Sequence, residues 1–203
     1  MPRTWRAGFV ATLFVAAFSC GDSTTGGSTT GPPTTSVTRH GEVSDPIGDT
    51  LSDSRVPIAP DLVHATVDVA AGNITFVIQL ASGTFDRQST RVVVLLDTDQ
   101  DGVTGIRQPN GLVADYGIDL EANTSQATIT KADPVGCVCF NVVGSTPVTF
   151  VPNGMQVNLS LSLLGNDDGR MSFQLNSNVF VAPMTAVGFD LMPDINLPPG
   201  SVQ

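Results

Sequence analysis

The chain has 203 residues, 41% of them apolar, and a formal net charge of −10. This length and composition predict one folded domain with a sizeable core, and not two comfortable ones. The acidic excess argues against nucleic acid and anionic membrane surfaces as partners, because both are negatively charged.

The first nineteen residues have the pattern of a secretory signal peptide. Arg3 and Arg6 stand in front of an apolar run from Ala7 to Phe18, and the small residue Ser19 closes the run. The run is too short for a comfortable membrane span. Removal of this segment would take two arginines and no acidic residue, so the formal charge would become −12.

Cys20 follows directly, in a stretch AAFSC that resembles a bacterial lipobox. In a lipobox the Cys becomes the acylated first residue of the mature chain, although Ala17 and Phe18 depart here from the usual residues. The tract GDSTTGGSTTGPPTTS has nothing to pack into a core and suits a flexible tether over residues 20–38. We therefore predict an exported lipoprotein, anchored at the outer membrane or the cell surface. An ordinary secreted protein with a disordered N-terminus is the alternative.

Residues 39–203 are predicted to form an all-β domain. Residues 39–61 show no sustained period and contain many turn formers, which favours an irregular segment, with a short edge strand as the alternative. LVHATVDV (62–69) and NITFVIQLA (73–81) alternate between apolar and polar residues, and the AAGN between them indicates a hairpin turn. TRVVVLLD (90–97) is apolar from Val92 to Leu96, as expected for a central strand covered on both faces.

The remaining strands are predicted from the same alternation. VADYGIDLE (113–121) alternates clearly, and the further candidates are QATITK, CVCFNVV, MQVNLSLSL, MSFQLNSN and TAVGFDL. No window shows a convincing helical stripe, although LLGNDDG has room for one helical turn. Of the nineteen acidic residues seventeen are Asp, which prefers turns to helices. These features predict a two-sheet antiparallel β-sandwich, with a closed barrel as the alternative.

The strand at 90–97 runs into LLDTDQDGVTG, in which Asp97, Asp99 and Asp101 occupy alternate positions before a Gly. Carboxylates this close repel one another unless water, a cation or a basic side chain neutralises them. The spacing matches the first half of an EF-hand loop, but Gln108 stands where the bidentate Glu would be. We predict a calcium site of another kind, in which Asp115 completes the shell. A solvated acidic turn is the alternative.

Two further acidic stretches lie near the two ends of the predicted domain. DPIGDT contains Asp45 and Asp49, and DLMPD contains Asp190 and Asp194. Because the ends of a domain often meet, these four residues are candidates to share a second cation. Capping of local turns is the alternative.

Besides Cys20, the chain has Cys137 and Cys139, in the stretch GCVCF. Residues i and i+2 of one strand lie near the outer limit for a disulfide, so a bridge would need a bulge or a local distortion. We favour a strained disulfide or two buried thiols over a metal site, because a lone CxC lacks the further ligands of a zinc site.

The succession DPIGDT, PDLVHATVDVAAGNITFVIQL, VVVLLDTDQDGVTG, ADYGIDL and DLMPD resembles bacterial secreted domains related to DOMON and to family nine carbohydrate-binding modules. The resemblance covers about residues 43–195 and implies a calcium-containing β-sandwich. It implies that the acidic positions Asp97, Asp99, Asp101 and Asp115 are ion ligands. Members of this wider group bind sugars or haem.

This sequence departs from both kinds of binder. Its only Trp, Trp5, belongs to the predicted signal, which leaves Tyr116 as the one candidate for stacking on a sugar ring. The only histidines are His40 and His64, and His64 lies on the polar face of a predicted strand, where a plain exposed histidine is favoured over a haem ligand. Without a nucleophile motif, no enzyme is predicted.

The sequence thus favours a non-catalytic binding or adhesion module on a lipid anchor, stabilised by calcium, with a glycan or a protein as its ligand. A structural accessory lipoprotein without a small ligand is the alternative. A hydrolase accessory domain that binds glycans is a less favoured reading.

Overall fold

The part of the chain that the computed structural model describes, residues 38–203 except 54–55, 57 and 182–185, is built from β-strands. The predicted signal peptide, Cys20 and the tether up to residue 37 lie outside the described residues. The strands are β1 (Arg39–Ser44), β2 (Leu51–Ser52), β3 (Leu62–Ala70), β4 (Asn73–Leu80), β5 (Arg91–Asp97), β6 (Ile106–Arg107), β7 (Val113–Ala114), β8 (Tyr116–Glu121), β9 (Gln126–Asp133), β10 (Cys139–Val151), β11 (Gly154–Ser160), β12 (Met171–Val181), β13 (Ala186–Met192) and β14 (Gly200–Val202). In this part of the chain no helix is long and apolar enough to cross a membrane.

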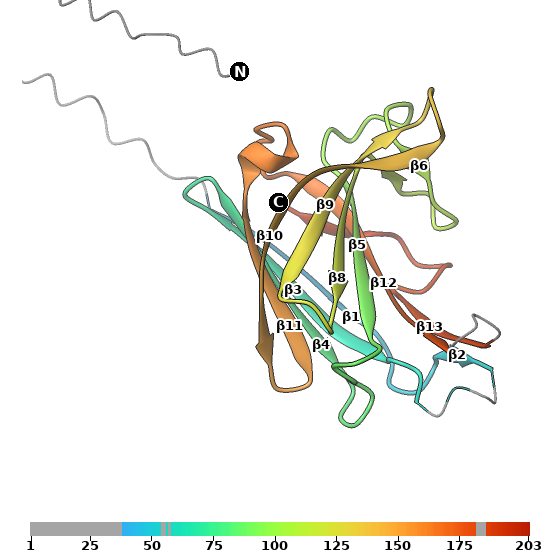
Figure 1. Cartoon of the computed structure of the whole chain (residues 1–203). Coiled ribbons are helices and arrows are strands. Elements are labelled where there is room, and N and C mark those ends of the chain that lie inside the picture. The colour runs from blue at the N-terminus through green and yellow to red at the C-terminus, as the bar shows by residue number, and fades with distance from the viewer. Residues whose placement is uncertain (1–37, 54–55, 57, 182–185) are drawn as a thin grey trace, which may run out of the picture. The chain divides into compact units, whose positions relative to one another are not determined.

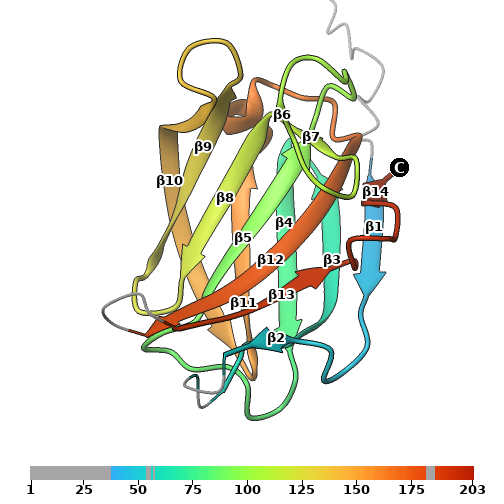
Figure 2. The ribbon, with the colours of Figure 1, turned by 90° about the vertical axis from the view of Figure 1, so that its right-hand side faces the viewer.

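Twelve of the strands form one curled antiparallel sheet that folds over into two layers (Figures 1 and 2). One layer contains β1, β3, β4 and β11, and the other contains β9, β8, β5, β12, β13 and β2, with β14 paired to β12. β10 joins the layers, because its residues 139–147 pair with β9 and its residues 148–151 pair with β11. A register shift between Val142 and Gly144 bends this long strand. The predicted all-β antiparallel sandwich is confirmed, with its two layers continuous through β10.

The β3–β4 hairpin shows how local sequence sets this fold. Ala71 and Gly72 have φ angles of 50° and 76°, the left-handed conformation that a tight two-residue hairpin turn requires. The turn fixes the register so that Val67 pairs with Phe76, and both side chains are fully buried between the layers. The predicted hairpin is therefore confirmed.

β5 is the central strand that its apolar sequence predicts. It lies between β8 and β12, and Val92, Val94 and Leu96 have no exposed surface. On its other face, Leu95 packs against Leu112 and Ala114, which come from the segment that carries β6 and β7. Both faces of the strand are thus covered, which explains why its apolar residues do not alternate with polar ones.

The segment 39–61, predicted to be irregular, contains β1, so the alternative of a short edge strand is the one observed. β1 pairs with β3 along six residues, and its backbone also bonds to the C-terminal end through His40 and Gln203. Gly41 is the buried residue of this strand, and a Cβ there would lie 2.5 Å from the backbone oxygen of Ser201. Because backbone contacts hold β1, it needs no apolar stripe that a periodicity search could find.

The predicted strand 155–163 ends earlier than expected. β11 stops at Ser160, whose side chain accepts a hydrogen bond from the backbone N–H of Ser162 and so caps a 3₁₀-helix over Leu161–Leu164. Gly165, with φ of 76°, ends this helix. The helical turn predicted for LLGNDDG is present, but it begins at Leu161.

Candidate metal centre

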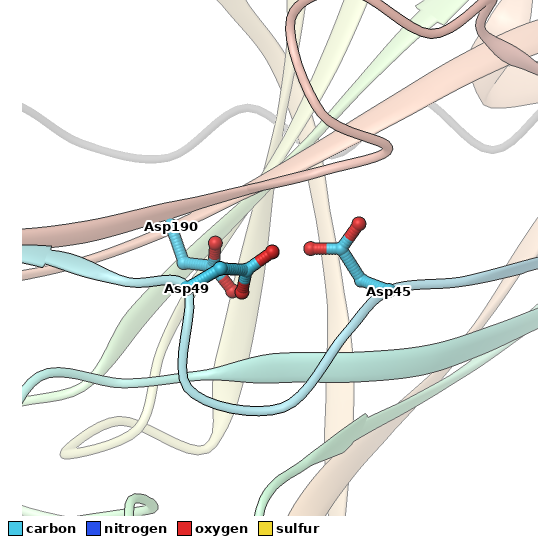
Figure 3. Close-up of side chains that lie close together, drawn as sticks. All are labelled: Asp45, Asp49 and Asp190. Carbon is cyan, nitrogen blue, oxygen red and sulfur yellow. The ribbon is translucent and has the colours of Figure 1, made fainter.

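Three carboxylates from the two ends of the domain meet beside β13. Asp45 follows β1, Asp49 follows the turn at Gly48, and Asp190 lies on β13 (Figure 3). Each offers an oxygen that lies within 4.8 Å of those of the other two. The two acidic stretches therefore come together as predicted, and Asp194 lines the cavity beside them.

Asp45 is the least compensated of these carboxylates. The residue is 9% exposed, and both of its carboxylate oxygens are shielded from solvent without a hydrogen-bond partner. The backbone N–H of Asp194 lies close enough to lower the pKa of Asp45, but its geometry falls short of a hydrogen bond. Burial and the charges of Asp190, Asp49 and Asp194 outweigh it and raise the pKa to about 7. A buried carboxylate without a partner is costly, so Asp45 indicates a site for a positive ligand.

Asp190 is held firmly in place. It is 4% exposed, its Oδ2 accepts a hydrogen bond from the backbone N–H of Leu62 at 2.7 Å, and its Oδ1 accepts one from Leu191 at 2.8 Å. Burial raises the pKa of Asp190 to about 6, although both hydrogen bonds oppose the shift. Each oxygen keeps a second lone pair, so these bonds orient the carboxylate and leave it able to bind a cation.

Asp61, which is not among the residues predicted from the sequence, positions the turn that precedes Asp49. Asp61 is 3% exposed, and its Oδ2 accepts a hydrogen bond from the backbone N–H of Gly48 at 2.9 Å. Its Oδ1 is buried without a partner, and burial, with a smaller contribution from the charge of Asp49, raises its pKa. Asp61 follows Pro60 at the start of a strand, where an Asp is an ordinary cap, so nothing in the sequence marks it.

The negative charge of this cluster is not balanced by the ion pairs found among the described residues. Those pairs join Arg39 to Asp168, His40 to Glu42 and Asp68, and Arg91 to Asp119. A cation would supply the balance. Carboxylate oxygens are the ligands that Ca²⁺ prefers, and oxygens on opposite sides of a bound Ca²⁺ lie about 5 Å apart, which the observed separation fits.

A cavity of about 180 Å³ is lined by Asp49 and Asp190, two of the three carboxylates, and offers a cation and its water ligands a route from solvent. Its lining consists of Asp49, Leu51, Phe189, Asp190, Leu191, Asp194 and Ile195. We call the group of Asp45, Asp49 and Asp190 the β13 carboxylate centre.

In the predicted calcium loop, by contrast, hydrogen bonds from within the loop stabilise several of the carboxylates. Asp115 is 6% exposed, and it accepts hydrogen bonds from the backbone N–H of Thr98 at 2.9 Å and from the Thr98 hydroxyl at 2.6 Å. Asp99 accepts from the Asp101 backbone N–H at 2.9 Å and from the Thr104 hydroxyl at 3.0 Å. Within the described residues, the only three-carboxylate grouping within 4.8 Å is the β13 carboxylate centre. Calcium at Asp97, Asp99, Asp101 and Asp115 stays a prediction.

Asp97 is the exception in this loop. One of its oxygens is buried without a partner. Burial, opposed by the backbone N–H of Gln100 and assisted by the charges of Asp115 and Asp99, raises its pKa. Asp167, from the turn after the 3₁₀-helix, lies near enough to Asp115 for the Asp115 charge to raise the pKa of Asp167, although burial is the main cause. Asp167 is not among the ligands predicted from the sequence, because the stretch that contains it has the composition of an ordinary turn.

A groove of about 570 Å³ lies next to this loop. Its lining consists of Thr98, Asp99, Val103, Thr104, Asp115, Tyr116, Lys131, Pro134, Val135, Leu164, Gly165 and Asp167. Tyr116, the predicted sugar-stacking residue, is 5% exposed and belongs to the main core, with the Lys131 ammonium 5.5 Å from its ring centre. With so little of its surface exposed, Tyr116 does not offer a ring face on which a sugar could stack, although it contributes to the groove lining.

The histidines and cysteines are placed as follows. His64 is half-buried and shares a 3.0 Å hydrogen bond between its Nδ1 and the Ser44 hydroxyl, while His40 Nδ1 lies 2.7 Å from Asp68 Oδ1.

Cys137 and Cys139 form a disulfide, which is one of the two alternatives predicted for this pair. The other alternative, two buried thiols, is wrong.

Comparison with known proteins adds no family. No model of a protein family matches the chain, and no curated protein matches it.

Proposed function

We propose that this chain is a non-catalytic β-sandwich module, stabilised by calcium, that is exported and displayed on a lipid anchor for binding or adhesion at the cell surface. One observation supports the bound cation most directly: the buried carboxylate of Asp45 has no hydrogen-bond partner and lies beside Asp49 and Asp190. The loop of Asp97 is a second candidate site on the same reasoning, since it too contains a buried oxygen without a partner.

A cation at the β13 carboxylate centre would join the two layers of the sandwich. Asp45 directly follows β1, which lies in one layer, whereas Asp190 lies on β13 in the other, and Asp49 lies between β1 and β2. Binding a cation there would stabilise the folded state, by an amount that grows with the logarithm of the cation concentration once this exceeds the dissociation constant.

The lipid anchor leads to a direct prediction. We expect Cys20 to be acylated and to form the N-terminus of the mature protein. Mass spectrometry of the protein from its native host should give a diacylated or triacylated Cys20, and Cys20→Ser should move the protein from the detergent phase to the aqueous phase. An unmodified N-terminus elsewhere, or unchanged partitioning of the variant, would contradict the anchor.

A ligand-binding module and a structural accessory lipoprotein make different predictions for the groove beside Tyr116. Its volume of about 570 Å³ is in the range of small-ligand sites. We expect a glycan array or a pull-down with the mature protein to give a ligand whose binding drops at least about tenfold in Lys131→Ala and Asp167→Asn variants, since each would lose a charged contact. Glu42→Gln is the control, because Glu42 is exposed and is not among the residues that line the groove. A protein that captures nothing in either assay would favour the structural accessory role.

A further inference from the structure

The loop between β9 and β10 carries a disulfide that the proposed function does not use. Cys137 and Cys139 are bridged with only Val138 between them, and their Cα atoms are 5.2 Å apart. Cys137 is exposed and Cys139 is half-buried, so the bridge is open to a reactant from solvent.

This disulfide contributes little to holding the fold together. The β9–β10 ladder already pairs Cys139 with Asp133 and continues to the pair of Pro147 with Gln126. A cross-link stabilises a protein mainly by closing a loop of the unfolded chain, and a bridge across one residue closes almost none. A structural staple is therefore a poor explanation of the pair.

The bridge also holds a residue in a conformation that it disfavours. Val138 has φ of 51°, and a β-branched side chain is strained in this left-handed region. Val138 is 67% exposed, so no packing around its side chain compensates for the strain. Opening the disulfide would let Val138 relax, which favours the reduced form.

Both sulfurs have an acceptor close by for the thiols that reduction would create. Asp133 Oδ2 lies 4.0 Å from the sulfur of Cys137, and Asn141 Oδ1 lies 3.9 Å from the sulfur of Cys139. The Asp133 carboxylate is fixed by the backbone N–H of Gly136, which donates to its Oδ1 at 2.7 Å. A thiol is a weak donor, so each acceptor would stabilise the reduced pair, and a stabilised reduced pair makes a disulfide a stronger oxidant.

We propose that the Cys137–Cys139 pair is a thiol–disulfide exchange site that oxidises dithiols. A thiolate of the dithiol attacks the exposed sulfur of Cys137, the bond between the two cysteines breaks, and Cys139 leaves as a thiolate that takes up a proton. The second thiolate of the dithiol then attacks the first sulfur of the same dithiol, which is bonded to Cys137 in the mixed disulfide. The sulfur of Cys137 leaves as a thiolate and is protonated. The dithiol loses two electrons and two protons and becomes a disulfide, while the pair becomes two thiols.

The equilibrium can be measured directly with glutathione. The mature protein, in a Cys20→Ser background, is equilibrated in buffers of defined reduced and oxidised glutathione, quenched with acid, alkylated and analysed by mass spectrometry. Val138→Gly is the matched variant, because Gly adopts a positive φ without strain. Reduction of the pair consumes two reduced glutathione (GSH) molecules and yields one oxidised glutathione (GSSG), so the midpoint is expressed as [GSH]²/[GSSG]. We expect the wild type to reach half-reduction at a value of [GSH]²/[GSSG] about tenfold lower than Val138→Gly does. Equal midpoints for the two proteins would overturn the proposal.

Two further measurements separate exchange chemistry from a structural role. A synthetic peptide with two cysteines should be oxidised stoichiometrically by the wild type and not by the Cys137→Ser, Cys139→Ser double variant. The double variant should melt within a few degrees of the wild type, since the bridge closes almost no loop. Failure to oxidise the peptide, or a large drop in the melting temperature of the double variant, would also overturn the proposal.

Discussion

Calcium is expected to raise the melting temperature of the mature protein, and removal of calcium by a chelator is expected to lower it again. At a free calcium concentration about one hundred times the dissociation constant, binding to the folded state alone adds about 2.7 kcal/mol to the free energy of unfolding. For a domain of this size that gain corresponds to a rise of about 5–10 °C. Differential scanning calorimetry with calcium and with chelator measures the shift.

Whether the Asp45→Asn variant is more or less stable than the wild type should depend on calcium. Asn has the shape of Asp without its charge, so the variant loses a cation ligand but also loses the repulsion that Asp45 has with Asp49 and Asp190. In chelator we expect the variant to be more stable than the wild type, and in calcium we expect it to be less stable. Asp99→Asn is the matched control, because this residue belongs to the other acidic loop and its Oδ1 can keep its hydrogen bonds as an amide oxygen.

The two variants also decide between the two candidate sites. If calcium still stabilises Asp45→Asn and no longer stabilises Asp99→Asn, the cation binds at the loop of Asp97 and not at the β13 carboxylate centre. If the wild type melts at the same temperature with calcium and with chelator, neither site binds calcium under these conditions, and both clusters are acidic turns.

The elements that could be predicted from the sequence are those that local patterns determine. The β3–β4 hairpin follows from two alternating runs and from Gly72, which adopts a positive φ without strain. β5 follows from an unbroken apolar run. β1 could not be predicted in the same way, because it has no apolar face. Close packing at Gly41 and backbone contacts to the C-terminal end hold this strand instead.

The candidate site shows the same limit. The four carboxylates at the two ends of the domain could be named from sequence, but their meeting depends on the order of strands in the curled sheet, which no local pattern encodes. The DTDQDG loop has the stronger motif. Yet Thr98 of this loop donates two hydrogen bonds to Asp115, the predicted fourth ligand, and so partly stabilises its negative charge. A motif shows which groups are available, whereas burial and hydrogen bonding decide which of them lack a partner.

Without calcium, the protein is expected to become less stable as the pH rises from about 4 to about 7. Asp45 has a folded-state pKa of about 7 and Asp190 one of about 6, both raised from an ordinary value of 3.8. Between these values the folded protein binds more protons than the unfolded chain does, so raising the pH favours unfolding. One such group contributes a slope of up to about 1.4 kcal/mol per pH unit. Above about pH 7 this contribution is constant, because Asp45 and Asp190 are then ionised in both states.

Urea unfolding of the metal-free protein at several pH values between 4.5 and 7.5 measures this slope, and Asp45→Asn isolates the part that belongs to Asp45. Carboxylates that do not interact with Asp45 titrate equally in both proteins, so the stability of the variant minus that of the wild type should grow as the pH rises. With calcium the difference should change sign toward pH 7, because the cation binds the ionised carboxylates and competes with the protons that Asp45 and Asp190 would otherwise take up. A difference that stays constant with pH in the metal-free protein would mean that Asp45 is ionised at an ordinary pKa, and the argument that its burial calls for a cation would fail.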